Sequence, residues 1–92
     1  MASLHQLNAQ HKLANCLKLL AKTDSLVLIE AAVALAVQAD FLQQLPQGVS
    51  VFALSSDLQA RGLLNNCSPA IQPLSDAEWV AASLEADRVC SW

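Results

Sequence analysis

The sequence predicts a single α/β domain in which a mostly parallel sheet of four or five strands carries helices on both faces. Two unbroken aliphatic runs, residues 26–29 and 49–54, are typical of strands buried on both faces. Segments that favour helix stand between the expected strands. Such alternation implies right-handed crossover connections, and therefore a parallel sheet.

The first half of the chain supplies two of these strands and two helical segments. Residues 4–7 alternate as a short strand, after which Asn8 is expected to cap a helix. The apolar positions of that helix recur at helical spacing: Leu13, Cys16, Leu17 and Leu20. After the strand at 26–29, the alanine-rich segment 31–39 favours helix, and residues 41–45 add a further turn.

The second half repeats the pattern from the strand at 49–54 onward. Ser55, Ser56 and Asp57 are expected to cap a short helix, residues 58–61, which Gly62 ends. Residues 71–74 form a weak strand. A helix then begins at Ser75 or Asp76, with Glu78 at the third position of a capping box. Residues 89–92 add a final strand. Because single domains most often have about 100 to 150 residues, residues 1–92 are expected to form one domain.

The composition predicts association with other protein surfaces. The chain has 92 residues, of which 54% are hydrophobic and 14% are charged. A domain of this size hides only about 60% of its unfolded surface. Large exposed apolar patches on water-soluble proteins mostly mark partner sites. We therefore expect an oligomer, including a homo-oligomer when the chain is alone.

Several classes of function are disfavoured by what the sequence lacks. The formal net charge is −3 and the five Lys and Arg residues are dispersed, so direct nucleic-acid contact is not expected. Two glycines cannot build a glycine-rich phosphate loop, and the histidines and cysteines lack metal-ligand spacing, so we expect no cofactor and no metal. The longest apolar window falls short of the ~20 residues that a membrane span requires.

The expected location is the cytoplasm, because no basic segment leads into an apolar run near the start of the sequence. Three widely spaced cysteines, an odd number, do not form a disulfide framework there.

Three residues qualify as site candidates when the family is left aside. His5, inside the first strand, is more often a hydrogen-bonded, partly buried residue than a catalytic base. Glu30 follows a buried strand, where open α/β sheets bind ligands, but a solvated or interface carboxylate is the favoured interpretation. Cys16 shares an apolar stripe, which favours a structural thiol over a reactive one.

Three segments together resemble the DsrH/TusB family, the smallest subunit type of the DsrEFH and TusBCD sulfur-relay complexes. They are SLHQLN at residues 3–8, VFALSSDLQARGL at residues 51–63, and a tryptophan as the last residue. The resemblance implies a flavodoxin-like (DsrEFH-like) subunit that assembles with TusC-like and TusD-like (DsrF- and DsrE-like) partners. The chain departs from the family pattern after the second strand, where Ala31 and Ala32 stand in place of a frequent Asp-Gly.

The resemblance also implies two possible roles. In the Tus branch, persulfide sulfur passes through a cysteine of the TusD-like subunit toward thiolation of a tRNA wobble uridine, and this chain would be a scaffold. In the DsrH-like alternative, the chain is a sulfurtransferase that carries persulfide on Cys16, within the Cys16-Leu17-Lys18 setting that such members share, and serves sulfur oxidation. A small hydrolase rests on fold analogy alone.

Overall fold

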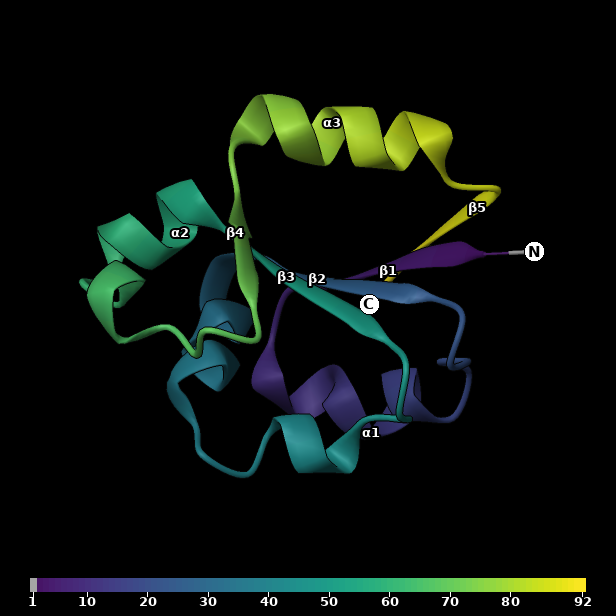
Figure 1. The fold of residues 1–92 in the computed structure, drawn as a ribbon, viewed down its shortest axis with the longest axis horizontal. Helices are drawn as coiled ribbons and strands as arrows, with labels where there is room; N and C mark the ends of the chain where they lie inside the picture. The colour runs from purple at the N-terminus through teal and green to yellow at the C-terminus, as the bar shows by residue number, and fades with distance from the viewer. Residues whose placement is uncertain (1) are drawn as a thin grey trace.

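A computed structural model describes residues 2–92 and shows a five-stranded sheet between two layers of helices (Figure 1). The strands are β1 (Ser3–Leu7), β2 (Ser25–Leu28), β3 (Ser50–Leu54), β4 (Gln72–Leu74) and β5 (Arg88–Ser91). The α-helices are α1 (Leu13–Leu17), α2 (Ser55–Ala60) and α3 (Asp76–Glu85). Four 3₁₀ segments complete the chain: η1 (Gln10–Lys12), η2 (Glu30–Val37), η3 (Leu42–Gln44) and η4 (Leu64–Asn66).

All strand pairs are parallel, in the order β4-β3-β2-β1-β5. The α/β class and the parallel sheet with helices on both faces are therefore confirmed. Each step from β1 to β4 moves to the next strand along the sheet, whereas α3 carries the chain back across it to β5. As a result α3 alone covers one face, and the other helices cover the opposite face (Figure 1).

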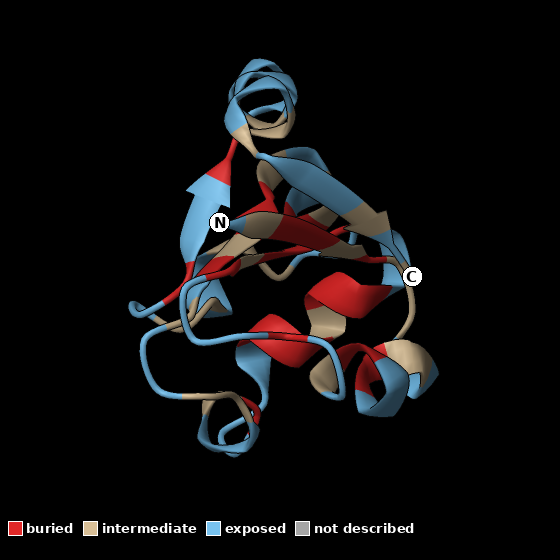
Figure 2. Cartoon of the chain, turned by 90° about the vertical axis from the view of Figure 1, so that its right-hand side faces the viewer, coloured by how far each residue is buried: buried red, intermediate tan, exposed pale blue. Residues whose placement is uncertain are grey.

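The two faces of the sheet hold cores of very different size. In β2, Leu26 and Leu28 point into the larger core with α1, η2 and α2, whereas Val27 points into the smaller core under α3. This alternation is what a strand buried on both faces requires. The smaller core has five buried residues: Leu4, Val27, Ile29, Leu54 and Leu74. Figure 2 shows the result, with buried residues in and below the sheet and a largely exposed α3 above it.

The alanine-rich segment is helical as expected, but it is the 3₁₀ helix η2 rather than an α-helix. In a 3₁₀ helix, residues three apart lie above one another. Here that geometry stacks Ala32 with Leu35 and Val33 with Ala36, and all four side chains are buried. The preceding Glu30 has φ of 51°, a left-handed conformation that is uncommon for a residue other than glycine.

Two of the expected helix ends are confirmed. Ser75 and Glu78 form a capping box at the start of α3, with Glu78 N donating to Ser75 Oγ and Ser75 N donating to Glu78 Oε1. Gly62 takes φ of 67° after α2, and the amides of Gly62 and Leu63 donate to the carbonyls of Gln59 and Leu58. This pair of bonds is a Schellman motif, which uses glycine in the left-handed position.

Other expected caps were wrong. Asn8 caps no helix, because the chain stays extended through Ala9, and its buried Oδ1 accepts no hydrogen bond from the described residues. Ser55, Ser56 and Asp57 lie inside the first turn of α2, whose N-cap is Leu54. The first helix is also shorter than predicted: α1 ends at Leu17, because the amides of Leu19 and Leu20 both turn back to the Cys16 carbonyl.

Within residues 2–92, no helix is long and apolar enough to cross a membrane.

Candidate functional site

Cys16 lies on the inner side of α1 with no exposed surface. It belongs to the larger core, among leucines from β1, α1 and the turn that follows α1. The sequence places this thiol on the apolar stripe of α1, and in the fold that stripe packs on the sheet. A thiol in this position is not open to a persulfide donor while α1 stays folded.

The surroundings of Cys16 also disfavour its reactive form. Burial, and secondarily the nearby Cys90 thiol, raise the pKa of Cys16 to about 11. Only the thiolate attacks a persulfide sulfur, and at pH 8 a thiol with that pKa is ionised in about one molecule in a thousand. The site therefore lacks both access and activation.

The other two thiols are half-buried. Cys90 stands opposite His5 in the register of β5 and β1, so its side chain projects on the same face of the sheet as His5. Cys67 Sγ points at the carbonyls of Ser68 and Ile71, at 3.6 and 3.8 Å, and burial raises its pKa. Cys67 is thus only partly exposed, because the loop that carries it folds back on its own backbone.

A buried hydrogen-bond chain runs from Asp24 through His5 to Trp92. His5 Nε2 and Asp24 Oδ2 are 3.1 Å apart, and Trp92 Nε1 donates to His5 Nδ1 at 3.0 Å. The two rings are nearly coplanar, with an interplanar angle of 11° and 6.2 Å between their centroids. Because the indole can only donate, Nδ1 is the acceptor and the imidazole proton lies on Nε2, directed at Asp24.

Asp24 also anchors the backbone of two segments. Its Oδ1 accepts from the amide of Ser3 at 2.9 Å, and its Oδ2 accepts from the amide of Ala21 at 2.9 Å. Burial works against the carboxylate, but these bonds and the one from His5 outweigh it and lower the pKa of Asp24. With both ring nitrogens of His5 engaged, the cluster is a structural clamp that joins β1, β2 and the chain after β5.

The sequence predicted only part of this clamp. His5 fits the expectation of a hydrogen-bonded residue, but its partner Asp24 was not predicted. The missing signal is register: β1 and β2 pair in parallel with Leu4 beside Ser25, which places Asp24 next to the start of β1.

The polar residues at the carboxyl edge of the sheet tie helices together. Asp57 Oδ2 accepts from the amide of Glu30 at 2.7 Å and thereby supports its left-handed conformation. Arg61 Nη1 lies 3.8 Å from Asp57 Oδ1. Ser56 Oγ donates to Asp76 Oδ1 at 3.0 Å, which links the starts of α2 and α3. These side chains therefore make their contacts within the domain. The Glu30 carboxylate itself is exposed.

Among residues 2–92, no group of three or more His, Cys, Asp or Glu side chains is placed to hold a metal ion.

Comparisons with known proteins give the family of the chain and a similar fold. Residues 8–89 match the family described as DsrH like protein. The fold is similar to the crystal structure of the ychN protein from E. coli, with a TM-score of 0.75 and 18% sequence identity over 99% of this chain and 97% of that chain. No curated protein matches the sequence. Because the family match spans most of the domain, including α1 and its buried Cys16, the chain belongs to the DsrH-like family of sulfur-relay-related subunits.

Proposed function

We propose that this chain is a scaffold subunit of a cytoplasmic, TusBCD-like relay complex that passes persulfide sulfur toward thiolation of a tRNA wobble uridine. TusC-like and TusD-like subunits are its partners, and the reactive cysteine belongs to a partner. Family membership supports the relay role. The burial of the chain's own Cys16 thiol supports the scaffold role within it.

The burial of Cys16 is the observation that carries this proposal. A sulfur carrier must meet the donor thiol and then the acceptor thiol, so its own sulfur needs an open approach. Cys16 is fully enclosed and its pKa is raised to about 11. The thiol is therefore better suited to packing α1 on the sheet than to exchanging sulfur.

The exposed apolar side chains support a role in assembly. Leu84 is 81% exposed, Leu19 is 65% exposed and Val80 is 55% exposed. Side chains of this kind on a small domain are typical of surfaces that other subunits cover.

Mass spectrometry after sulfur loading tests the proposal. The chain is incubated with a persulfide donor, alone and with TusC-like and TusD-like proteins, and intact mass and peptide mapping locate any added sulfur atom. The expected result is sulfur on a partner cysteine and none on Cys16. A Cys16→Ala variant that still assembles and supports partner loading would strengthen the scaffold role.

One observation favours the alternative, in which Cys16 carries persulfide as in a DsrH-like sulfurtransferase of sulfur oxidation. Helix α1 is only five residues long and is flanked by a 3₁₀ segment and a tight turn, so it is a candidate for local opening. Partner binding that opened α1 would expose the thiol. Sulfur on Cys16 only in the presence of partners would establish this role and reject the scaffold assignment.

A further inference from the structure

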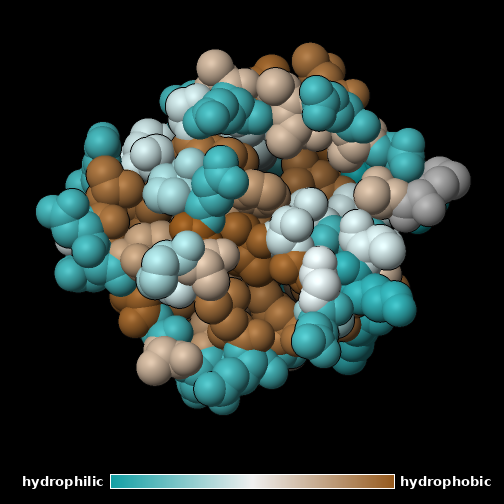
Figure 3. All heavy atoms as spheres, viewed as in Figure 1, coloured by the Kyte–Doolittle hydropathy of each residue, from teal (hydrophilic) through white to brown (hydrophobic). Residues whose placement is uncertain are grey.

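Helix α3 carries a second apolar stripe on the side that faces away from the sheet. Trp79, Ala82 and Ala86 pack on the smaller core, as a surface helix normally does. Four other apolar residues recur at positions i, i+3, i+4 and i+7 of the same helix, and every one of them is exposed: Ala77, Val80, Ala81 and Leu84. Brown and tan atoms along the upper edge of Figure 3, over α3, show this apolar character.

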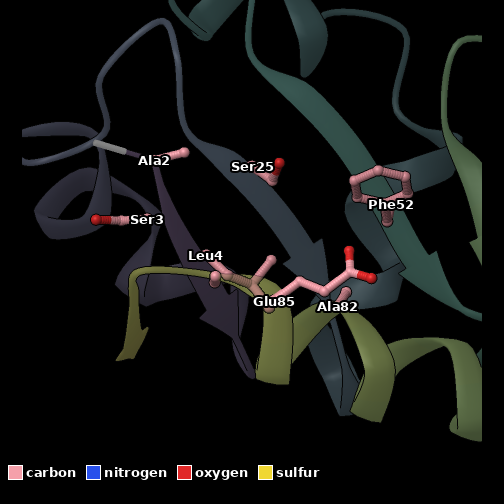
Figure 4. Close-up of a pocket in the computed structure, with 8 residues that line it drawn as sticks. Ala2, Ser3, Leu4, Ser25, Phe52, Ala82 and Glu85 are labelled. Atoms are coloured by element: carbon pink, nitrogen blue, oxygen red, sulfur yellow. The ribbon is translucent and has the colours of Figure 1, made fainter.

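The contact of α3 with its own sheet is incomplete. No residue of α3 is fully buried, and a cavity of about 330 Å³ remains between its C-terminal half and the first residues of β1 and β2. Figure 4 shows Phe52 on one wall of this cavity and the Glu85 side chain extending from α3 toward it, while Ser25 lies on another wall. An aromatic ring, two serine hydroxyls and a carboxylate suit an aliphatic stem that ends in a cation.

Two segments on opposite faces of the sheet differ in the sign of their charge. Residues 75–92, which include α3, hold four acidic residues and one basic residue, Arg88. Residues 9–22, which include α1, hold three lysines and no acidic residue. Within the described part of the chain, ion pairs form only between His5 and Asp24 and between Arg61 and Asp57, so the α3 acids have no cationic partner closer than 4 Å.

The basic surface also has an apolar centre. Lys18 and Lys22 flank Leu19, and all three side chains are exposed just after α1. This segment follows α1, which lies on the opposite side of the sheet from α3 (Figure 1). Each surface has an exposed leucine among charges, and the signs of the charges are opposite.

We propose that two copies of this chain associate head to tail, with the outer stripe of α3 on one copy covered by the Lys18–Leu19–Lys22 surface of the next. A lysine stem of the second copy enters the cavity beside Phe52, and its ammonium group meets the Glu85 carboxylate. A two-fold pairing of α3 with itself is disfavoured, because it would bring Glu78 and Glu85 against the same acids of the partner. A head-to-tail contact leaves one free surface at each end, so it continues into a ring or an open chain.

Sedimentation of the whole chain over a range of protein and salt concentrations tests this contact. The wild-type weight-average mass is expected to rise with concentration beyond that of a dimer and to fall at high salt. Leu84→Glu and the double variant Lys18→Glu/Lys22→Glu are each expected to weaken self-association about tenfold or more. Gln59→Glu, which adds the same charge on the exposed side of α2, is the matched control and should associate like wild type.

Mixing the two weakened variants gives the sharpest result. Each retains one intact surface, so an equimolar mixture is expected to form a dimer and no larger species. Circular dichroism melts confirm that each variant is folded.

A wild-type chain that stays monomeric at all concentrations and low salt overturns the proposal. Self-association of the lysine double variant at wild-type strength also overturns it, since that result indicates α3 pairing with α3. Sulfur loading of a partner is measured separately, so neither result decides the proposed relay role.

Discussion

His5 and Asp24 meet inside the fold with 3.1 Å between Nε2 of the imidazole and Oδ2 of the carboxylate, and both side chains are buried. They are separated by 19 residues in sequence and belong to the first strand and the turn before the second. The contact joins β1 to the turn before β2, and these two strands pair in the sheet. Trp92, which donates to the other ring nitrogen, extends the clamp to the far end of the described chain.

Replacing Asp24 by Asn is expected to destabilise the domain by about 3 kcal/mol, because two backbone amides and His5 lose a charged acceptor in a buried place. Urea unfolding at neutral pH measures the change. Asp40→Asn, the same substitution at an exposed position, is the control and should alter stability little. An Asp24→Asn chain as stable as wild type would show that the clamp contributes nothing.

The same carboxylate predicts a pH dependence. Its folded pKa lies below the unfolded value, so its stabilisation is fully present above the unfolded pKa, near 3.9, and disappears as the pH falls through the folded pKa. Wild type should therefore lose stability in acid more steeply than Asp24→Asn does. Unfolding free energies measured at pH values from neutral into the acid range compare the two slopes. Parallel curves would contradict this assignment.

Trp92→Phe removes the indole donor but keeps an aromatic ring beside His5. One neutral hydrogen bond contributes about 1 kcal/mol, and the loss also leaves Nδ1 of His5 without its donor. We expect a decrease of about 1 to 2 kcal/mol in the free energy of unfolding. The imidazole nitrogen shifts in an NMR spectrum report the tautomer, which should be fixed in wild type and mixed in the variant.

The three cysteines should differ in their reaction with a thiol reagent. Cys16 is enclosed and has a raised pKa, whereas Cys67 and Cys90 are half-buried. We expect Cys16 to be labelled last, at a rate set by opening of α1, as followed by mass spectrometry of peptides. Labelling of Cys16 as fast as Cys90 would show that the thiol is accessible and would favour the carrier role.

The two glycines predict a difference in substitution cost. Both have positive φ, but a Cβ at Gly62 meets no atom within 4 Å, whereas a Cβ at Gly48 lies 3.1 Å from the Lys22 carbonyl oxygen. Gly62→Ala should cost about 1 kcal/mol from backbone strain alone. Gly48→Ala should cost more, because the neighbouring backbone must also move. Thermal melts of the two variants measure the difference.

The order of strands and helices and the parallel character of the sheet follow from the sequence alone. Those features depend on local periods and on chain connection rules, so runs such as residues 26–29 predict them without knowledge of neighbours. The capping box at Ser75 and the glycine at the end of α2 were predictable for the same reason, since each motif is completed within a few residues.

Which polar groups meet depends on how distant segments of the chain pair in the fold. Asp57 bonds the amide of Glu30 instead of capping its own helix, and Asp24 finds His5, because parallel pairing brings distant residues into register. The same holds for the α3 surface, where exposure of the outer stripe follows from which side of the helix rests on the sheet. Sequence period showed that Cys16 lies on an apolar stripe, but packing of α1 on the sheet enclosed the thiol and raised its pKa.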